Sequence, residues 1–190
     1  LRARGFTVAV LDQGTVAWGA SGRNGGQICT GFSPGLEPLE AALGREAAQV
    51  CFDVSEEAKT LITERIARYG IDCDLKPGQL VCAPRQRHMA HLAHEHETLA
   101  RYGYDKTTLL SRPELEERLG TTAYCGALKD DGASHFHPLN YAIGLARALK
   151  EEGGLIFENS RVVEIRNGPR PVVATGKGSV RARFVVMACN

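Results

Sequence analysis

The sequence lacks the features that mark membrane, disordered and nucleic-acid-binding proteins. No apolar run approaches the ~18 residues that a membrane-spanning helix needs, and no signal-peptide pattern opens the sequence. The formal charge is only +1, from 23 basic and 22 acidic side chains, too small to attract nucleic acid or an anionic membrane by bulk electrostatics. Because 43% of the 190 residues are hydrophobic, the chain can bury a core. We therefore expect a globular protein that binds neither nucleic acid nor membranes.

The cysteines lack any CxxC pairing. All six stand apart, at positions 29, 51, 73, 82, 125 and 189. Scattered cysteines in a chain of this length, without a secretion signal, are typical of reduced thiols. The pattern predicts a cytoplasmic protein. Cys73 lies between Asp72 and Asp74, so we expect its thiolate to be disfavoured.

The first two thirds of the sequence predict a strand followed by a mainly helical segment. Residues 6–11 form a continuous apolar run that ends in Asp12, typical of a parallel strand buried on both faces. Helical spacing follows over 46–69 and 86–102, with a hairpin expected between them around Pro77-Gly78. The first helix is expected to bury the apolar positions Ala47, Val50, Val54, Ala58, Leu61, Ile62, Ile66 and Tyr69. A capping box, Ser111-Arg-Pro-Glu114, begins a short helix that Gly120 ends.

Beyond residue 124 an α/β pattern returns. We expect a short strand over 126–129 and a helix over 138–152. Strands follow near 155–158, 161–166, 172–175 and 181–188, with turns at Asn167-Gly168 and Gly176-Lys-Gly178. The fold class is therefore α/β in its parts and α+β overall. The order of elements is typical of a nucleotide-binding domain interrupted by an inserted domain.

Asp12 occupies the place of a ribose-binding acid. In a dinucleotide-binding unit that acid ends the second strand, ~20 residues beyond a G-x-G-x-x-G turn. Only eleven residues precede Asp12, so we expect the phosphate turn and the first strand to lie before Leu1, which makes the chain incomplete. The alternative is an Asp that merely ends a strand as a turn residue.

A glycine-rich segment, AWGASGRNGGQ over residues 17–27, follows Asp12. Its four glycines let the backbone approach a ligand closely, and successive N–H groups in such a loop can bind an anion. Arg23 presents a fork suited to phosphate. A nicotinamide-binding domain does not need a second glycine loop here, whereas an extended flavin dinucleotide does. The alternative is a flexible connecting loop.

Asp12 together with GASGRNGGQ (residues 19–27) resembles the FAD-dependent amine and amino-acid oxidases of the D-amino-acid oxidase, glycine oxidase and sarcosine oxidase superfamily. ERIARYGIDCDLKPGQL (64–80) and YCGALKDDGASHFHPLNYAIG (124–144) are similar to segments of its γ-glutamylputrescine oxidase branch. The resemblance implies a partial Rossmann-like FAD-binding domain over 1–35 and 135–190. It also implies a mainly helical substrate-domain segment with a β-hairpin over 36–134.

The same resemblance assigns eight residues to FAD. Asp12 would hold the adenosine ribose, and Val163 would contact the adenine through its backbone. Ser21 and Arg23 would face the pyrophosphate and ribityl chain. Four consecutive residues would lie along the flavin ring: Asn24, Gly25, Gly26 and Gln27. Members of the family more often carry Glu at the position of Asp12, so the shorter acid must sit closer to the ribose.

The activity implied by the resemblance is oxidation of an amine C–N bond to an imine, with O₂ reduced to H₂O₂. The small-molecule amine would be γ-glutamylputrescine, in putrescine catabolism. Two alternatives stay open: a related oxidase of sarcosine, glycine or another amino acid, and a non-catalytic nucleotide-binding fragment. A nicotinamide-dependent dehydrogenase is disfavoured by the second glycine loop.

No side chain is predicted to be catalytic or to bind a metal. His88, His91 and Glu95 fall within a ~60° arc of a helix, but they lack a closed four-ligand pattern, so we expect a solvated face. His135 and His137 are expected to cap a helix or pack between domains, and the alternative is that one of them lines the active site. Cys29 is expected to act as a small buried apolar residue.

Overall fold

The computed structural model describes residues 1–189, which fall into two compact units. One unit comprises Leu1–Asn24, Tyr69–Ile71 and the chain from Pro138 onward. The other comprises Gly25–Arg68 and Asp72–His137. Asn190, which ends the predicted FAD-binding segment 135–190, lies outside the described residues.

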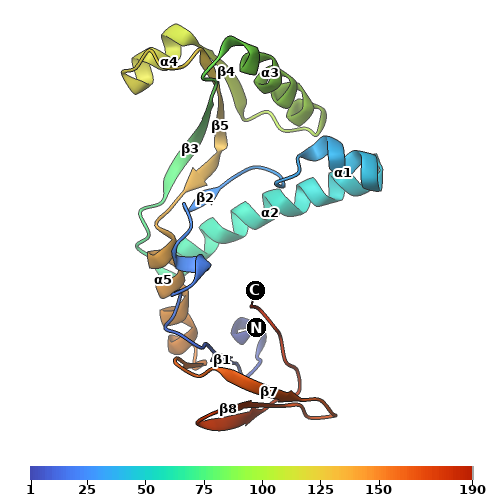
Figure 1. The fold of residues 1–190 in the computed structure, drawn as a ribbon, viewed down its shortest axis with the longest axis vertical. Coiled ribbons are helices and arrows are strands. Elements are labelled where there is room, and N and C mark those ends of the chain that lie inside the picture. The colour runs from blue at the N-terminus through green and yellow to red at the C-terminus, as the bar shows by residue number, and fades with distance from the viewer. Residues whose placement is uncertain (190) are drawn as a thin grey trace. The chain divides into compact units, whose positions relative to one another are not determined.

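The first unit contains a parallel pair of strands. β1 (Ala9–Leu11) lies beside β6 (Leu155–Phe157), with Val10 opposite Ile156. The short helix η1 (Arg2–Arg4) precedes β1, and α5 (Pro138–Glu151) precedes β6 (Figure 1). The parallel pairing agrees with the prediction, but burial on both faces is wrong: Val10 is 40% exposed. The reason is that β1 has a single neighbour among the described strands.

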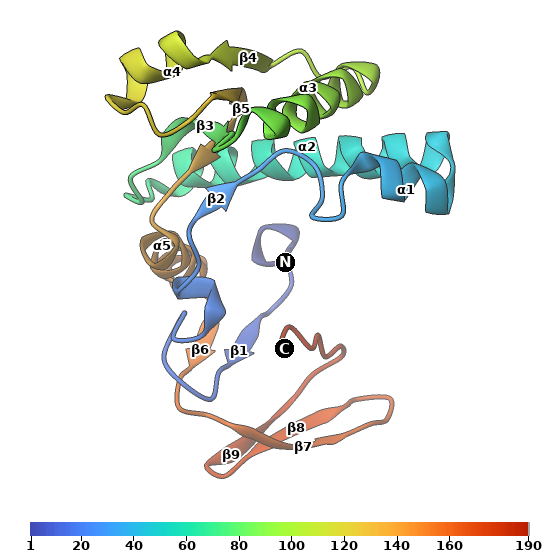
Figure 2. The same cartoon turned by 45° about the horizontal axis from the view of Figure 1, so that its top comes forward.

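A three-stranded antiparallel sheet completes the first unit. It consists of β7 (Val162–Arg166), β8 (Val172–Thr175) and β9 (Gly178–Arg181), in that order (Figure 2). The two residues Gly176 and Lys177 connect β8 to β9, as the turn signal predicted. The strand expected over 181–188 is wrong. Phe184 and Met187 are 72% and 74% exposed, because no strand of the described chain lies beside them to complete a ladder.

The second unit is built on a four-stranded antiparallel sheet. Its central strand is β5 (Gly126–His135), which pairs with β3 (Lys76–Cys82) on one side. On its other side β5 pairs with β4 (Thr107–Ser111) and, further along, with β2 (Gln27–Ile28). The accompanying helices are α1 (Leu36–Leu43), α2 (Arg45–Tyr69), α3 (Gln86–Arg101) and α4 (Arg112–Leu119).

The hairpin predicted at Pro77-Gly78 is wrong. β3 runs through both residues, and its register against β5 shifts between Pro77 and Gln79. Gly78 has φ +84°, so the turn-like pair forms a bulge within a strand whose partner is distant in sequence. The capping box is confirmed: the Ser111 N–H donates to the Glu114 carboxylate at 2.8 Å.

The face of α2 that is buried also differs from the prediction. Val50 and Val54 are 61% and 53% exposed, whereas Ala48, Phe52 and Lys59 are buried. The aromatic ring of Phe52 packs against Tyr102 and Tyr104, with ring centroids 5.7 and 5.9 Å apart. Aromatic packing therefore orients the helix more strongly than the aliphatic stripe.

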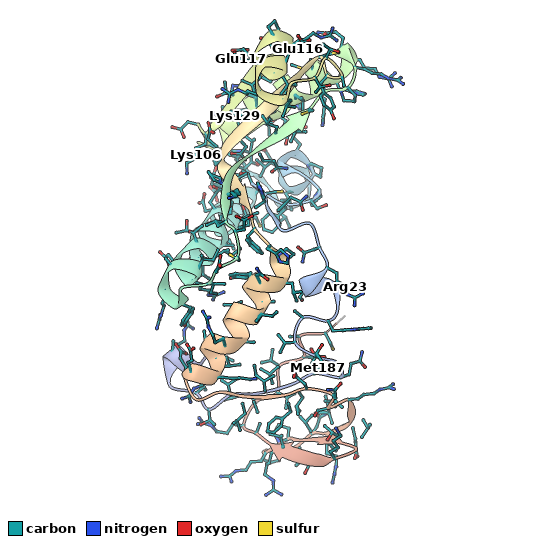
Figure 3. All side chains as sticks on the ribbon, turned by 90° about the vertical axis from the view of Figure 1, so that its left-hand side faces the viewer. Arg23, Lys106, Glu116, Glu117, Lys129 and Met187 are labelled. Atoms are coloured by element: carbon teal, nitrogen blue, oxygen red, sulfur yellow. The ribbon has the colours of Figure 1, made fainter. Side chains whose placement is uncertain are left out.

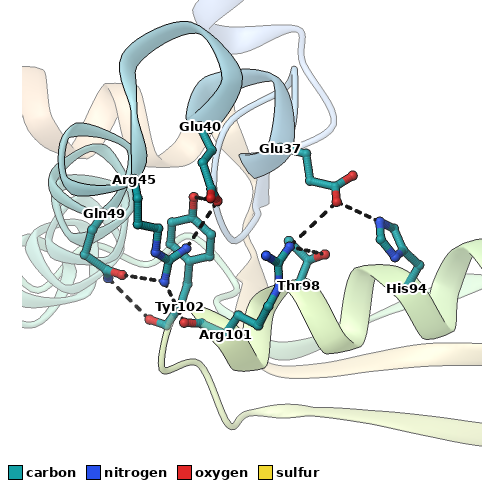
Figure 4. A network of polar contacts seen from close by, with 8 residues as sticks. All are labelled: Glu37, Glu40, Arg45, Gln49, His94, Thr98, Arg101 and Tyr102. Atoms are coloured by element: carbon teal, nitrogen blue, oxygen red, sulfur yellow. Dashed lines mark hydrogen bonds and ion pairs between the residues drawn. The ribbon is translucent and has the colours of Figure 1, made fainter.

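A polar network joins α1, α2 and the end of α3 (Figure 4). The Arg45 guanidinium stacks 3.5 Å from the centroid of the Tyr102 ring and donates to the Arg101 carbonyl at 2.6 Å. The Tyr102 hydroxyl donates to Glu40 at 2.8 Å. This hydrogen bond, together with the charges of Arg45 and Arg101, lowers the pKa of Glu40 below its usual value.

Lys59 lies at the centre of a second, buried network. Its ammonium group contacts Thr30 Oγ1 at 2.7 Å and Glu56 Oε1 at 2.8 Å. Asp130 of β5 accepts hydrogen bonds of 2.5 Å from both the Thr30 and Tyr104 hydroxyls. Burial and the bond to Asp130 raise the pKa of Tyr104, which therefore stays a neutral donor. Nothing in the periodicity of α2 indicates this network, because Lys normally marks a solvated face.

The Tyr102–Glu40 hydrogen bond predicts a pH-dependent stability difference. Because the folded pKa of Glu40 is depressed, the contribution of this carboxylate is present above its unfolded pKa and is lost as pH falls through the folded pKa. We expect Tyr102→Phe to lower the thermal midpoint at pH 7 and to approach wild-type behaviour in acid, measured by circular dichroism. The thermal midpoint of Glu40→Gln should lack this pH dependence. If Tyr102→Phe lowers the thermal midpoint equally at every pH, the Tyr102–Glu40 hydrogen bond is not the cause.

Lys59 predicts a large stability effect. Lys59→Met leaves Glu56 without its cation and removes the donor to Thr30 and Tyr104, so the free energy of unfolding should fall by on the order of 3 kcal/mol. Lys76→Met is the matched control, because its ion pair with Asp74 has the same 2.8 Å length but exposed side chains (57% and 70%, against 11% and 23% for Lys59–Glu56). Chemical denaturation of both variants measures the difference, and equal effects would refute the role of burial.

Candidate functional site

Asp12 lies directly after β1, at the carboxyl end of the parallel strand pair. Its N–H donates to the Phe157 carbonyl at 3.0 Å, which extends the pairing of β1 with β6 by one residue. Its Oδ1 accepts a 2.8 Å hydrogen bond from the Gly14 N–H. Within residues 1–189, Oδ2 accepts none. Ligands of α/β sheets bind at the carboxyl ends of parallel strands, so this oxygen is placed to accept from a ligand hydroxyl.

The chain that follows β6 is bonded to the chain that follows β1. Ser160 donates from its N–H to the Asp12 carbonyl at 2.7 Å, and Asn159 donates to the Gly14 carbonyl at 2.9 Å. Glu158 accepts the Val16 N–H at 2.6 Å through Oε1. Glu158 was not predicted as a site residue, although it follows a strand as Asp12 does. These bonds fix residues 12–16 at the strand ends.

Val163 lies at a bulge in β7. The register passes from the pair Val162–Thr175 to the pair Glu164–Ala174, so Val163 is the extra residue and is outside the β7–β8 ladder. Its side chain is 67% exposed. The bulge at an edge strand is where the predicted contact with adenine, through main-chain groups, would lie.

The glycine-rich loop of the first unit is wound into a short 3₁₀ turn, η2 (Ala20–Gly22). A Cβ on Gly22 would lie 2.2 Å from the Ala17 carbonyl oxygen, so no other residue fits there. The Asn24 side-chain amide donates to the carbonyls of Ala20 and Ser21, both at 3.0 Å. Asn24 therefore stabilises the turn as well as following it.

Ser21 and Arg23 are exposed on this loop. The Arg23 guanidinium lies 5.0 Å from the centroid of the Trp18 ring (Figure 3). Stacking on an aromatic ring restrains the guanidinium and leaves its N–H groups available. The contacts of both residues with FAD stay predictions.

Gly25, Gly26 and Gln27 belong to the second unit. Gly26 is buried with φ +71°, a conformation that favours glycine, and its carbonyl accepts the Phe136 N–H at 3.0 Å. Gln27 pairs with His135 where β2 meets β5. A Cβ on Gly25 would lie 2.4 Å from Gln27 Oε1, the end of a flexible side chain. Because Gly25 has no side chain, the Gln27 amide occupies a cradle beside its Cα, and a ligand there would displace that amide.

A cleft of about 650 Å³ opens beside Gly25 and Gln27 within the second unit. Its walls come from β3, β5 and α4, and they include Leu80, Arg118, Leu119, Lys129, Asp131 and His135. Lys129 and Asp131 are bonded to each other at 2.7 Å. His135, expected to cap a helix or to pack between domains, ends β5 and lines this cleft.

The remaining sequence candidates have structural rather than catalytic surroundings. No group of three or more His, Cys, Asp or Glu side chains within residues 1–189 is arranged to hold a metal ion. Cys29 is exposed, which corrects the expectation that it is buried. Cys73 is buried, and burial, followed by the charges of Asp72 and Asp74, raises the pKa of its thiol as predicted. All six cysteines are free.

No helix within residues 1–189 is long and apolar enough to cross a bilayer.

Comparison with known families identifies a class of flavoproteins. The family described as FAD dependent oxidoreductase (DAO) matches residues 1–190. The chain therefore belongs to the DAO family of FAD-dependent oxidoreductases, whose cofactor is FAD. The predicted family, cofactor and fold class are confirmed.

Each relative aligns with nearly all of this chain, whereas this chain aligns with only about half of each relative. It is 39% identical to γ-glutamylputrescine oxidoreductase of Escherichia coli K12 over 98% of the chain and 44% of that protein. It is 38% identical to a probable oxidoreductase of Haemophilus influenzae, again over 44% of the relative. Among solved structures, glycine oxidase from Geobacillus kaustophilus has a TM-score of 0.77 and 26% identity, covering 99% of this chain and 50% of that one. The chain thus spans about half the length of its relatives.

The described residues fit FAD. Asp12 offers a carboxylate oxygen for a ribose hydroxyl, and Val163 lies at a bulge in an edge strand. The space beside the Gly25 Cα holds the flexible Gln27 amide, which a ligand approaching the backbone there would displace. These features are chemically suited to a dinucleotide with a sugar and a flat ring.

Gly22 and Gly19 provide a matched test of the loop. Gly22→Ala forces the Ala17 carbonyl to move, whereas a Cβ on Gly19 meets nothing within 4 Å. If the 3₁₀ turn shapes the FAD site, Gly22→Ala should weaken FAD binding at least tenfold and Gly19→Ala should not. Flavin absorbance per protein, measured on the product of the complete reading frame, gives the ratio. Equal FAD content in the two variants, with unchanged circular dichroism, would contradict the role of the turn.

Proposed function

We propose that the complete protein oxidises an amine C–N bond to an imine, with O₂ as electron acceptor, and that its substrate is γ-glutamylputrescine. The observation that carries the proposal is the glycine-rich segment after Asp12, in a chain 39% identical to an E. coli enzyme named for that substrate. The amine loses two electrons and two protons, which O₂ takes up as H₂O₂. Water then splits the imine into an aldehyde and ammonia.

The chain's own residues bind and orient in this proposal. Asp12 accepts hydrogen bonds from the ribose through Oδ2, and Val163 presents its backbone to the adenine. Ser21 and Arg23 contact the pyrophosphate and ribityl chain. The residues along the ring are Asn24, Gly25, Gly26 and Gln27. FAD, when bound, supplies the hydride-accepting chemistry. No side chain of this stretch is assigned as a general acid or base.

The same proposal assigns a role to each segment of the chain. Segments 1–35 and 135–190 bind FAD, and segment 36–134 belongs to the substrate domain. The six free cysteines support a cytoplasmic location, because the cytoplasm keeps thiols reduced.

A second candidate is oxidation of glycine, sarcosine or another small amino acid. It is favoured by the TM-score of 0.77 to glycine oxidase. The two candidates differ in the substrate that is oxidised. The rate of H₂O₂ release with each amine therefore distinguishes them.

The experiment uses the product of the complete reading frame, purified with FAD. We expect flavin absorbance and H₂O₂ release with γ-glutamylputrescine, at a kcat/KM at least tenfold above those for sarcosine and glycine. Preference for sarcosine or glycine would establish the second candidate. FAD binding without peroxide from any of the three amines would refute oxidase activity toward them.

Gly25→Val tests the residues assigned to the ring. A branched side chain fills the cradle, so flavin content should fall at least tenfold, while the fold tolerates displacement of the Gln27 amide. Gly176→Val is the control, because a Cβ there meets nothing within 4 Å in a turn between β8 and β9. Full flavin content in Gly25→Val would count against the assigned contact.

A further inference from the structure

The two faces of β5 carry different chemistry. Leu128 packs in a buried cluster with Ala83 and Leu92, and Asp130 belongs to the buried Lys59 network. Lys129 and Asp131 alternate with them and line the cleft, with 28% and 54% of their side chains exposed. The charges of Lys129 and Asp131 thus lie on the side of the sheet that the buried cluster and network do not cover.

The cleft runs along β5 from Gln27 toward Lys129. Gln27 is in register with His135, whereas Lys129 is in register with Leu80 further along the strand. β3 spans this stretch in four residues, from Lys76 opposite His135 to Leu80 opposite Lys129, because β5 is irregular between Asp130 and Ser134. At about 3.3 Å per residue, Lys129 therefore lies roughly 13 Å along the sheet from the Gln27–His135 pair, with Asp131 between them. A ligand whose reactive end lies at Gly25 and Gln27 would extend its other end toward these charges.

The chemical groups of γ-glutamylputrescine match this arrangement. One end is the primary amine, and the other is an α-amino-acid group with a carboxylate and an ammonium on one carbon. Eleven bonds separate the terminal nitrogen from a carboxylate oxygen, an extended length of about 13 Å at the per-bond reach of a peptide chain. An amine oriented toward Gly25 therefore brings the zwitterion to Asp131 and Lys129.

The Lys129–Asp131 ion pair is suited to exchange partners with such a zwitterion. An exposed ion pair contributes little to stability, so opening it costs little. The ligand carboxylate then replaces Asp131 beside Lys129, and the ligand ammonium replaces Lys129 beside Asp131. Arg118, at the end of α4 on the cleft wall, adds a guanidinium that can bind a carboxylate through two N–H groups.

We propose that Lys129, Asp131 and Arg118 form a subsite for the α-amino-acid end of the substrate, with Lys129 and Arg118 on the carboxylate and Asp131 on the ammonium. The proposal rests on the proposed function, because it takes the substrate class from there. It assigns substrate selection to the open face of β5.

The test compares γ-glutamylputrescine with N-acetylputrescine, which keeps the amine and the amide but lacks the zwitterion. In the FAD-loaded complete protein, we expect the ratio of the two kcat/KM values to fall at least tenfold in Lys129→Met and in Asp131→Asn, through KM. Lys129→Arg, which keeps the charge, should retain most of the ratio. Lys106→Met is the matched control, because Lys106 is an exposed lysine that does not line the cleft.

A binding measurement separates failure of the subsite from failure of the proposed reaction. γ-Glutamylethylamide carries the amino-acid end but lacks the terminal primary amine of the putrescine arm, and calorimetry gives its Kd. Binding that weakens at least tenfold in Lys129→Met and Arg118→Met, but not in Lys106→Met, supports the subsite even if neither amine is oxidised. An unchanged kcat/KM ratio in Lys129→Met, or no binding of γ-glutamylethylamide to the unmodified protein, overturns it.

Discussion

The second unit depends on the pairing of one strand, β5, with three others. β3 covers one edge of β5, while β4 and β2 share the opposite edge, so its backbone is held along nearly its full length. A strand held in this way cannot slip, and its side chains keep to fixed faces. Asp130 is thereby committed to the buried network with Lys59 and Tyr104, and its neighbours on either side to the cleft.

In the first unit a different constraint positions the candidate site. β1 and β6 are short, but their ends are joined by main-chain hydrogen bonds from Ser160 to Asp12 and from Asn159 to Gly14. The carboxylate of Asp12 is therefore held by the backbone on both sides of it. The glycine-rich segment that follows adds a turn in which Gly22 has no room for a side chain. Local geometry here is set by main-chain contacts rather than by burial of a core.

Features set by neighbouring residues were predictable from the sequence. The capping box at Ser111, the helix over 86–101 and the location of Asp12 after an apolar strand depend on short-range patterns, and the structure has each of them. Family membership followed from the glycine-rich segment. Gly26, with its positive φ, shows why that segment is so restricted in sequence.

Features set by distant partners were not predictable. Pro77-Gly78 has the sequence of a turn, but pairing with β5 turns it into a bulge. The inward face of α2 is decided by Phe52 and by Lys59, whose hydrogen-bond partners Thr30 and Tyr104 are 29 and 45 positions away along the chain. Glu158 contacts Val16 across a separation of 142 positions. Periodicity carries no information about such contacts.

Because side chains alternate along β5, neighbouring residues of this strand differ in how freely they can be substituted. Even-numbered positions from Leu128 to Asp130 are tied to the stability of the unit, so changes there are selected against through folding. Lys129 and Asp131, one peptide unit away, contribute almost nothing to the core. Substitutions at Lys129 and Asp131 can therefore change ligand preference while leaving their buried neighbours in place, whereas Ala127, on the same face, is fully buried against Leu110 and Leu115.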